Sequence, residues 1–262
     1  MNRIVIGHYF PADSPVHRLD PRIKLLGVIA YVTALLFVTH FAAFAVAAIA
    51  LAITIRTARI PIRFVLRGLR FIFFVLFFAA AINVFFTPAE NAFFTFGFIR
   101  LSTDGLYRAA FMIVRLVLLV TGSSLLTLTT SPIKLTDGIE SLLRPTRLPA
   151  HDIALMMTIA LRMIPTLAEE TDKTMKAQKA RGADLETGGP IKRARNLLPI
   201  LVPLFISSFK RADELATAME ARCYQGGEGR TKMYPLKFTR ADAVAAGILT
   251  LFCTLLIFSR II

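Results

Sequence analysis

The sequence has few of the residues that build disulfide frameworks, thiol metal sites or nucleotide-binding loops. Only two cysteines occur, Cys223 at the polar end of a helical pattern and Cys253 in an apolar segment. Two isolated thiols in such different contexts predict neither a disulfide framework nor a cysteine metal site. The phosphate-binding pattern Gly-x-x-x-x-Gly-Lys is also absent, so the chain lacks the usual ATP-binding loop. We therefore expect no cofactor and no bound metal.

Histidines are too scattered to form a catalytic or metal site. None of His8, His17, His40 and His151 lies three or four residues from another histidine or a cysteine. No series of Asp, Glu or His runs through the apolar segments, as it does in proton-coupled carriers. His151 and Asp152 could form an acid–base pair, but the start of a helix accounts for them better. We expect no catalytic residues, and keep a membrane-embedded enzyme and a self-sufficient carrier or channel as alternatives.

Acidic residues are scarce relative to basic ones. The 262 residues include 17 Asp or Glu and 31 Lys or Arg, and 55% of the chain is hydrophobic, with 22 Phe. A soluble domain is nearer about 45–50% apolar. The basic residues gather in blocks that alternate with uncharged segments, as cytoplasmic loops alternate with membrane spans. The sequence thus predicts an integral membrane protein in a lipid bilayer and argues against nucleic-acid binding.

Long segments almost free of charge predict the membrane spans, and they cover residues 25–55, 71–87, 109–130 and 241–259. The first has no Asp, Glu, Lys or Arg over 31 residues, whereas one span needs roughly 20. Two short helices forming a hairpin that turns near His40 keep the flanking basic blocks in the cytoplasm; one tilted helix is the alternative. We predict an all-α integral membrane protein with about five transmembrane helices and an external loop at 88–108.

A basic segment follows the first span. Residues 56–70 contain five arginines and no acid, at spacings of three and four that put them on one face of a helix. Two interpretations stay open. The segment is either a surface helix on anionic lipid headgroups or a solvated loop whose charge orients the neighbouring spans.

Residues 131–240 are polar and predict three further helices, giving domains at 1–130, 131–240 and 241–262. The first helix starts at Ser131 and ends at Pro145, the second runs from a cap near Asp152 to Arg181, and the third runs from near Asn196 to Arg222. Each of the last two has an apolar, proline-containing half and then a polar half. We expect the apolar half to lie at the membrane and the polar half to project into the cytoplasm.

The two long helices end in the same residue frame, 41 residues apart. In each, an Asp is followed five residues later by an Ala, three residues later by a second Ala, and then by Arg. The first copy is Asp172, Ala177, Ala180 and Arg181, followed by Gly182, and the second is Asp213, Ala218, Ala221 and Arg222, followed by Cys223. Arginine at a helix end could simply complement the helix dipole, which contributes under about 1 kcal/mol. That explanation does not account for the recurrence of the alanines in register. Small alanines allow close approach, and guanidinium can bind carboxylates or carbonyls, so we interpret both ends as docking sites.

The stretches Met163–Asp184 and Val202–Arg222 closely resemble the transmembrane T component of energy-coupling factor (ECF) transporters, and the similarity extends from Asp20-Pro21-Arg22 to the last span. The resemblance implies two Ala-Arg-Gly signatures at the ends of coupling helices. It also implies a non-catalytic scaffold in an ATP-driven importer of vitamins or other micronutrients. Two ABC ATPase subunits, expected as a heterodimer, and a substrate-binding S component would be its partners.

By this resemblance, the ATPases would dock on Ala180, Arg181 and Gly182 at one end and on Ala221, Arg222 and Cys223 at the other. Cys223 departs from the family pattern, which has glycine there, and a cysteine is less suited to a left-handed helix stop. We expect the second helix to stop differently, for example at Gly226-Gly227. The implied location is the bacterial cell membrane, with the N-terminus and 131–240 cytoplasmic and the C-terminus external.

Overall fold

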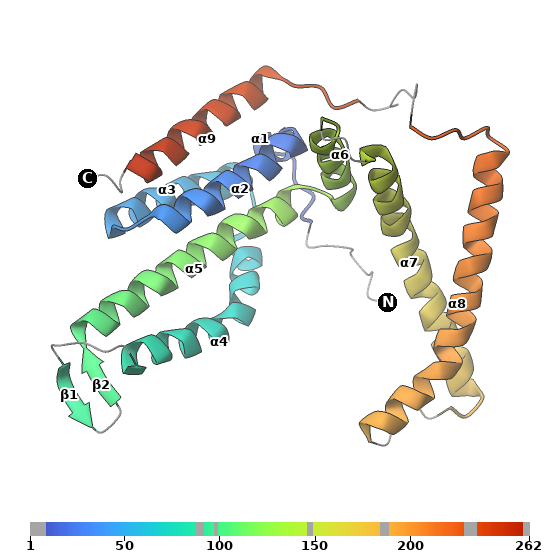
Figure 1. Ribbon diagram of the computed structural model, residues 1–262, viewed down its shortest axis with the longest axis horizontal. Coiled ribbons are helices and arrows are strands. Elements are labelled where there is room, and N and C mark those ends of the chain that lie inside the picture. Colours follow the sequence, from blue (N-terminus) through green and yellow to red (C-terminus); the bar gives the residue numbers. More distant parts are fainter. Residues whose placement is uncertain are drawn as a thin grey trace. The chain divides into compact units, whose positions relative to one another are not determined.

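A computed structural model describes residues 9–86, 92–96, 99–145, 149–183, 189–227 and 235–258, most of them helical (Figure 1). The chain divides into two compact units. One contains residues 7–138 together with 235–262, and the other contains residues 139–234 together with 1–6. The last helix of the chain therefore packs with the first ones. The domain boundaries given above stay a prediction.

The larger unit is formed by helices and one small β-hairpin. Its elements are α1 (Pro15–Arg18), α2 (Pro21–Phe37), α3 (Phe41–Thr57), α4 (Ile62–Phe86), β1 (Ala92–Phe96), β2 (Ile99–Ser102), α5 (Thr103–Thr129) and α9 (Arg240–Phe258). Helix α2 packs on α5 and α9, and α4 packs on α5. The antiparallel strands replace part of the loop predicted at 88–108, and α5 starts at Thr103, inside that range.

The helix break predicted near His40 is confirmed. Helix α2 ends at Phe37 and α3 begins at Phe41, and the chain reverses between them (Figure 1). Arg115 of α5 donates a 2.6 Å hydrogen bond to the Val38 carbonyl in this turn, and its guanidinium lies 4.8 Å from the centre of the Phe111 ring. This arginine thus satisfies a helix-end carbonyl inside an apolar unit, where an unpaired charge would be costly.

Close packing of α2 on α5 depends on a glycine. Tyr31 of α2 is buried, and its hydroxyl donates a 3.1 Å hydrogen bond to the Leu118 carbonyl of α5. A Cβ at Gly122 would overlap the Tyr31 ring. Gly122 therefore lets α2 approach α5 closely, as small residues commonly do between membrane helices.

Asp242 joins the starts of two helices. Its carboxylate is buried and accepts hydrogen bonds of 2.8 Å from the Asp20 backbone and 2.6 Å from the Thr239 hydroxyl. Asp20 in turn caps α2 by accepting from the Arg22 backbone at 2.9 Å. The carboxylates of Asp20 and Asp242 thus accept hydrogen bonds from backbone amides at the starts of α2 and α9. Amides at a helix start have no partner within the helix, so these carboxylates cap both helices.

The basic segment 56–70 is not one helix. Helix α3 ends at Thr57 and α4 begins at Ile62, so Arg56 and Arg63 belong to different helices and Arg59 lies in the corner between them. The prediction of five arginines on one helical face is therefore wrong. Arg59 has φ +55°, and this left-handed residue ends α3 before the chain turns.

Large apolar side chains cover much of the described surface of α4. Phe73, Phe74, Phe77 and Phe78 are each more than 60% exposed. An apolar surface of this kind is stable in lipid and a liability in water. Among the described residues, two helical segments are long and apolar enough to cross a membrane, Gly105–Thr129 and Ala150–Ala180. The helical, membrane-embedded architecture predicted from composition agrees with this surface.

Replacing Gly122 by alanine should destabilise the protein by about 1–3 kcal/mol, because the methyl group overfills the contact with Tyr31. The matched control is Gly247→Ala in α9, where nothing lies within 4 Å of the added carbon. The control should be neutral or up to about 1 kcal/mol more stable, because alanine favours helix. Thermal unfolding in detergent, followed by circular dichroism, measures both. Equal effects of the two substitutions would contradict the packing described here.

Candidate docking site on the paired helices α7 and α8

The smaller unit is dominated by two long helices, α7 (Ala150–Ala180) and α8 (Pro190–Glu220), each of 31 residues. They follow α6 (Pro132–Leu143), which crosses the boundary between the units. The start predicted near Asp152 is correct to within two residues, but its cap and the start of the next helix were predicted wrongly. Asp152 lies within the first turn of α7 and does not cap it, and α8 begins at Pro190, not near Asn196. Proline suits a first helical position because its missing amide would be unpaired there anyway.

Helices α7 and α8 lie side by side and run in opposite directions (Figure 1). Contacts along their length give the register. His151 near the start of α7 is 3.2 Å from the Tyr224 hydroxyl beyond the end of α8, and Gln178 near the end of α7 donates to the Pro199 carbonyl at 3.4 Å. Pro203 has no amide to bond that carbonyl within α8, so the Gln178 side chain takes its place.

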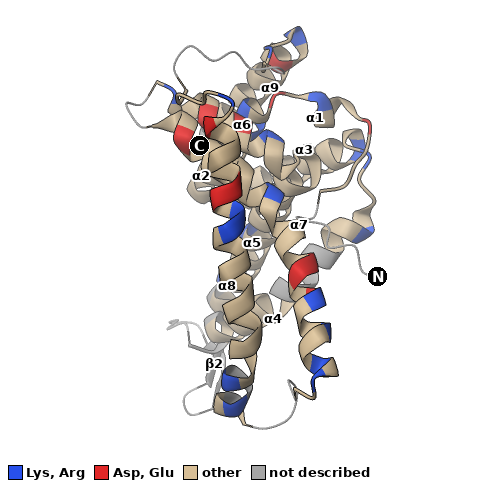
Figure 2. Ribbon diagram, turned by 90° about the vertical axis from the view of Figure 1, so that its right-hand side faces the viewer, with Lys and Arg blue, Asp and Glu red and all other residues tan. Residues whose placement is uncertain are grey.

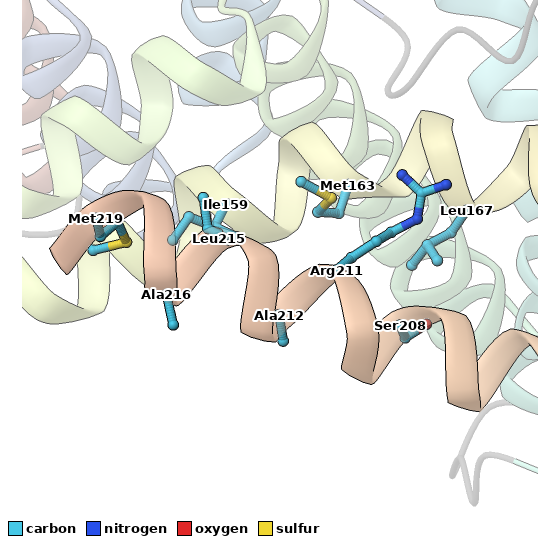
Figure 3. A pocket seen from close by; sticks show the side chains of 9 residues that line it. All are labelled: Ile159, Met163, Leu167, Ser208, Arg211, Ala212, Leu215, Ala216 and Met219. Atoms are coloured by element: carbon cyan, nitrogen blue, oxygen red, sulfur yellow. The ribbon is translucent and has the colours of Figure 1, made fainter. Parts of the chain in front are cut away.

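An apolar groove lies along the middle of the pair. It has a volume of about 240 Å³ and is lined by Ile159, Met163, Leu167, Ser208, Arg211, Ala212, Leu215, Ala216 and Met219. Figure 3 shows Leu215 of α8 beside Ile159 of α7, and Arg211 extending towards α7 next to Leu167. The small residues Ser208, Ala212 and Ala216 of α8 recur every fourth position along the groove, and the two alanines are exposed.

A polar contact holds the helices together at the end of the groove. The Glu170 carboxylate of α7 accepts a hydrogen bond from the Ser207 hydroxyl and forms a 3.0 Å ion pair with Arg211, both on α8. We call these three residues the clasp. Its members are 37 and 41 residues apart in the sequence, so local patterns gave no sign of it. Sequence reasoning missed these residues because only the pairing of the helices brings them together.

Antiparallel pairing places the two arginine ends at opposite ends of α7 and α8. The contact of His151 with Tyr224 puts Arg222 near the start of α7, roughly 25 residues along that helix from Arg181. At 1.5 Å per residue, the two arginines lie roughly 40 Å apart. Figure 2 shows the charged half of α7 towards one end of the pair and the half of α8 that carries both acidic and basic residues towards the other, with further basic residues at the start of α8. The polar halves therefore do not project in one direction, as the sequence suggested.

The two helix ends have the same backbone structure. At the first, the amide of Gly182 bonds the Lys179 carbonyl, and the amide of Ala183 bonds the Gln178 carbonyl five residues back, both at 3.0 Å. At the second, Cys223 and Tyr224 make the equivalent bonds at 2.8 and 3.1 Å, to Glu220 and Met219. This is the Schellman arrangement, which needs a left-handed residue after the last helical one.

Cys223 supplies that left-handed residue itself. Its φ is +55°, where Gly182 has +85°. The prediction that the second helix stops differently, at Gly226-Gly227, is therefore wrong, although Gly226 also has a positive φ of +91°. The left-handed conformation of a cysteine lowers the stability of the fold by roughly 1–2 kcal/mol. The hydrogen bond from the Tyr224 amide to the Met219 carbonyl offsets part of this loss.

The residues of both signatures are accessible. Ala180, Arg181 and Gly182 are exposed, and so are Ala221, Arg222 and Cys223. Within the described part of the chain, neither guanidinium has a hydrogen bond or ion pair. Each arginine can therefore place its planar fork of donors on another molecule without first breaking a bond.

The second helix end is also tied to the rest of its unit. Tyr224 contacts the His151 ring, whose Nδ1 is 3.8 Å from the buried Glu140 carboxylate. Arg144 lies 3.7 Å from the same carboxylate. His151 is therefore engaged by Tyr224 and Glu140, whereas Asp152 is exposed. This arrangement gives no support to an acid–base pair of His151 and Asp152.

Exchanging the left-handed residues should change the stability of the two ends in opposite directions. Cys223→Gly should stabilise the second end by about 0.5–1 kcal/mol, after allowing for the greater freedom of glycine in the unfolded chain. Gly182→Ala should destabilise the first by about 1–2 kcal/mol. Hydrogen exchange at the Tyr224 and Ala183 amides measures each end separately. Faster exchange at Tyr224 in Cys223→Gly would contradict the strain assigned to Cys223.

Helices that expose this much Phe, Leu and Ile need lipid around them, so the molecule is a helical integral membrane protein. Comparison with known protein families identifies which kind of membrane protein it is. The family model described as cobalt transport protein, CbiQ, matches residues 12–233, and the chain belongs to that family.

Three relatives are similar over nearly their whole length, each named energy-coupling factor transporter transmembrane protein EcfT. The protein of Clostridium kluyveri is 51% identical over 98% of this chain and 97% of its own. That of Thermanaerovibrio acidaminovorans is 51% identical over 95% and 93%, and that of Bacillus subtilis 44% identical over 99% of both. The resemblance to T components of ECF transporters is thereby confirmed.

Proposed function

We propose that this chain is the scaffold of an ECF importer, linking two ABC ATPase subunits to a substrate-binding S component. The observation that carries the proposal is the pair of matching, exposed arginine ends at opposite ends of α7 and α8. Two alike docking residues roughly 40 Å apart suit two similar partners, one at each end. Hydrolysis of ATP would take place on those partners.

Arg181 and Arg222 would each insert into a groove on one ATPase. The neighbouring alanines, Ala180 and Ala221, leave room for a groove wall, and the guanidinium can bind a carboxylate or several carbonyls there. Gly182 and Cys223 have positive φ, so the chain turns just after each arginine and each helix ends there. The two ends differ in the left-handed residue, Gly182 or Cys223, and in the contact of Tyr224 with His151 at the second end, so a heterodimer of ATPases suits the pair.

Coupling would be mechanical. ATP binding would draw the two ATPases together and move Arg181 and Arg222 with them. Because the clasp and the groove join α7 to α8, movement of the ends would change the angle at which the helices cross. Helix pairs accommodate such changes by small sliding of packed side chains. That change would reach the S component through the apolar halves of the same helices.

The S component would dock on the apolar surface of α7 and α8. Leu198, Val202, Phe205 and Phe209 of α8 recur at spacings of four and three, and each is more than half exposed. Met156 adds a further exposed apolar side chain on α7. Leucine, phenylalanine and methionine surfaces can repack against different partners, which suits a scaffold that releases its substrate-binding subunit. The substrates would be vitamins or other micronutrients, selected by that subunit.

The proposed orientation follows the distribution of basic residues. The N-terminus and residues 131–240 would lie in the bacterial cytoplasm, where the ATPases are, and the C-terminus would be external. The net charge of the 131–240 segment, with 18 Lys or Arg and 12 Asp or Glu, agrees with the cytoplasmic side.

Arg181→Glu with Arg222→Glu should abolish ATPase binding and uptake. Removing one partner of a buried charge pair costs about 2–5 kcal/mol, so each single substitution should weaken binding of one ATPase about 30-fold or more. Co-purification of tagged protein with its ATPases, and substrate uptake by cells, are the measurements. The docking role fails if the double variant keeps both.

The matched control is Lys173→Glu with Lys210→Glu. Both lysines are exposed, and each lies two turns or more before the arginine of its own helix. The control changes the net charge by the same amount and should keep ATPase binding. An equal loss in the control would mean that net charge, not the arginine ends, governs docking.

Phe205→Ser with Phe209→Ser should weaken co-purification of the S component and leave ATPase binding intact. These rings are 67% and 64% exposed, and losing them removes apolar area from the proposed contact. Leu197→Ser is the control, because Leu197 is 45% exposed on the same helix and the 3.6-residue period puts it on a different side of α8 from the stripe. Loss of the ATPases in the phenylalanine variant, or equal loss of the S component in the control, would argue against this assignment.

A further inference from the structure

The corner between α3 and α4 carries three exposed arginines within eight residues. Arg56 is in the last turn of α3, Arg59 is in the corner, and Arg63 is in the first turn of α4. The backbone brings the first two together, because the Arg59 amide bonds the Arg56 carbonyl at 3.1 Å. This corner lies in the larger unit and has no part in the proposed ATPase docking.

Arg59 has a backbone conformation that glycine would adopt more easily. Its φ is +55°, and the amide of Ile60 bonds the Ile55 carbonyl five residues back, as at the ends of α7 and α8. Arginine is rarely found in this region, since its Cβ meets the following carbonyl. Such residues persist where the surroundings hold them, and they gather at functional sites.

The surroundings of Arg59 do hold the corner in place. Ala58 and Ile60 on either side of it are buried, and they pack in one cluster with Val65, Leu125 and Leu128. Burial of both neighbours fixes the backbone and turns the Arg59 side chain outwards. The packed backbone of the corner therefore holds the Arg59 side chain at a fixed place on the surface.

No acid neutralises these arginines. Within the described residues, Arg56, Arg59 and Arg63 have no ion pair. Asp13 interacts electrostatically with Arg59, but it is bound by Arg18 through two hydrogen bonds of 2.8 and 2.9 Å. The hydrogen bonds from Arg18 lower the pKa of Asp13, so its charge is already matched. The corner therefore keeps three arginines without an ion pair among the described residues.

Exposed apolar side chains continue from the arginines along both helices. Ile49 and Ile53 are 61% and 58% exposed and precede Arg56 by seven and three residues, which puts all three on one face of α3. On α4, Ile62 and Leu66 are 62% and 55% exposed beside Arg63. An acyl chain lying along Ile49 and Ile53 would place its phosphate about one helical turn above them, at Arg56.

We propose that the α3–α4 corner binds the headgroup of an anionic phospholipid, with the phosphate held by Arg56, Arg59 and Arg63. Guanidinium groups bind phosphate oxygens through paired hydrogen bonds. A soluble phosphate would use the arginines alone and leave the apolar stripe without a role. The adjoining Ile49 and Ile53 therefore favour a lipid over a free anion.

Lipid titration of the purified full chain, followed by native mass spectrometry, tests the proposal with phosphatidylglycerol and phosphatidylcholine. Each arginine near an anionic lipid contributes about fivefold in affinity. The preference for phosphatidylglycerol should fall about fivefold in Arg59→Gly and on the order of a hundredfold in Arg56→Gln/Arg59→Gln/Arg63→Gln. Arg59→Gly should melt no lower than the natural chain in phosphatidylcholine, because glycine suits φ +55°.

The charge-matched control removes three exposed basic residues of α7 and α8: Lys173→Gln/Arg195→Gln/Lys210→Gln. It should keep the lipid preference. The proposal is overturned if the triple corner variant keeps its preference, or if the control loses as much. It is also overturned if glycerol phosphate, which has no acyl chains, competes as well as the lipid does.

Discussion

The antiparallel register of α7 and α8 sets the position of every residue in the candidate docking site. The clasp defines that register, yet its ion pair contributes little net stability, since Arg211 remains 41% and Glu170 24% exposed. Apolar contact between the two helices, such as that of Leu215 with Ile159, supplies the larger part. The clasp thus selects one alignment among several that apolar packing alone would allow, and both arginine ends are fixed by it.

Local sequence patterns predicted the features that depend on a few neighbouring residues. The break near His40 and the left-handed stop at Gly182 followed from apolar length and from glycine chemistry. The direction of α8 relative to α7 could not be predicted, because it depends on contacts between residues about 40 apart. Cys223 was misjudged because a hydrogen bond to Met219 and the fold around Tyr224 hold a conformation that cysteine alone disfavours.

In the part of the chain that the structure describes, three helices end in the same way, with an amide that bonds a carbonyl five residues back. Only one of the three left-handed residues is glycine; the others are Arg59 and Cys223. Each of these ends displays an arginine on the surface, either at the left-handed residue or just before it. A sharp helix end is an effective way to hold a long, flexible cation in one place, because the backbone beneath it has little freedom.

Glu170 and Arg211, which meet in the clasp, are 41 residues apart, and so are Arg181 and Arg222. When equivalent positions of two like helices meet in antiparallel fashion, an approximate two-fold axis passes between them. Turning the pair by half a circle would exchange its arginine ends. A single polypeptide thereby presents the symmetry of a dimer. It also remains free to vary each half independently, as the difference between Gly182 and Cys223 illustrates.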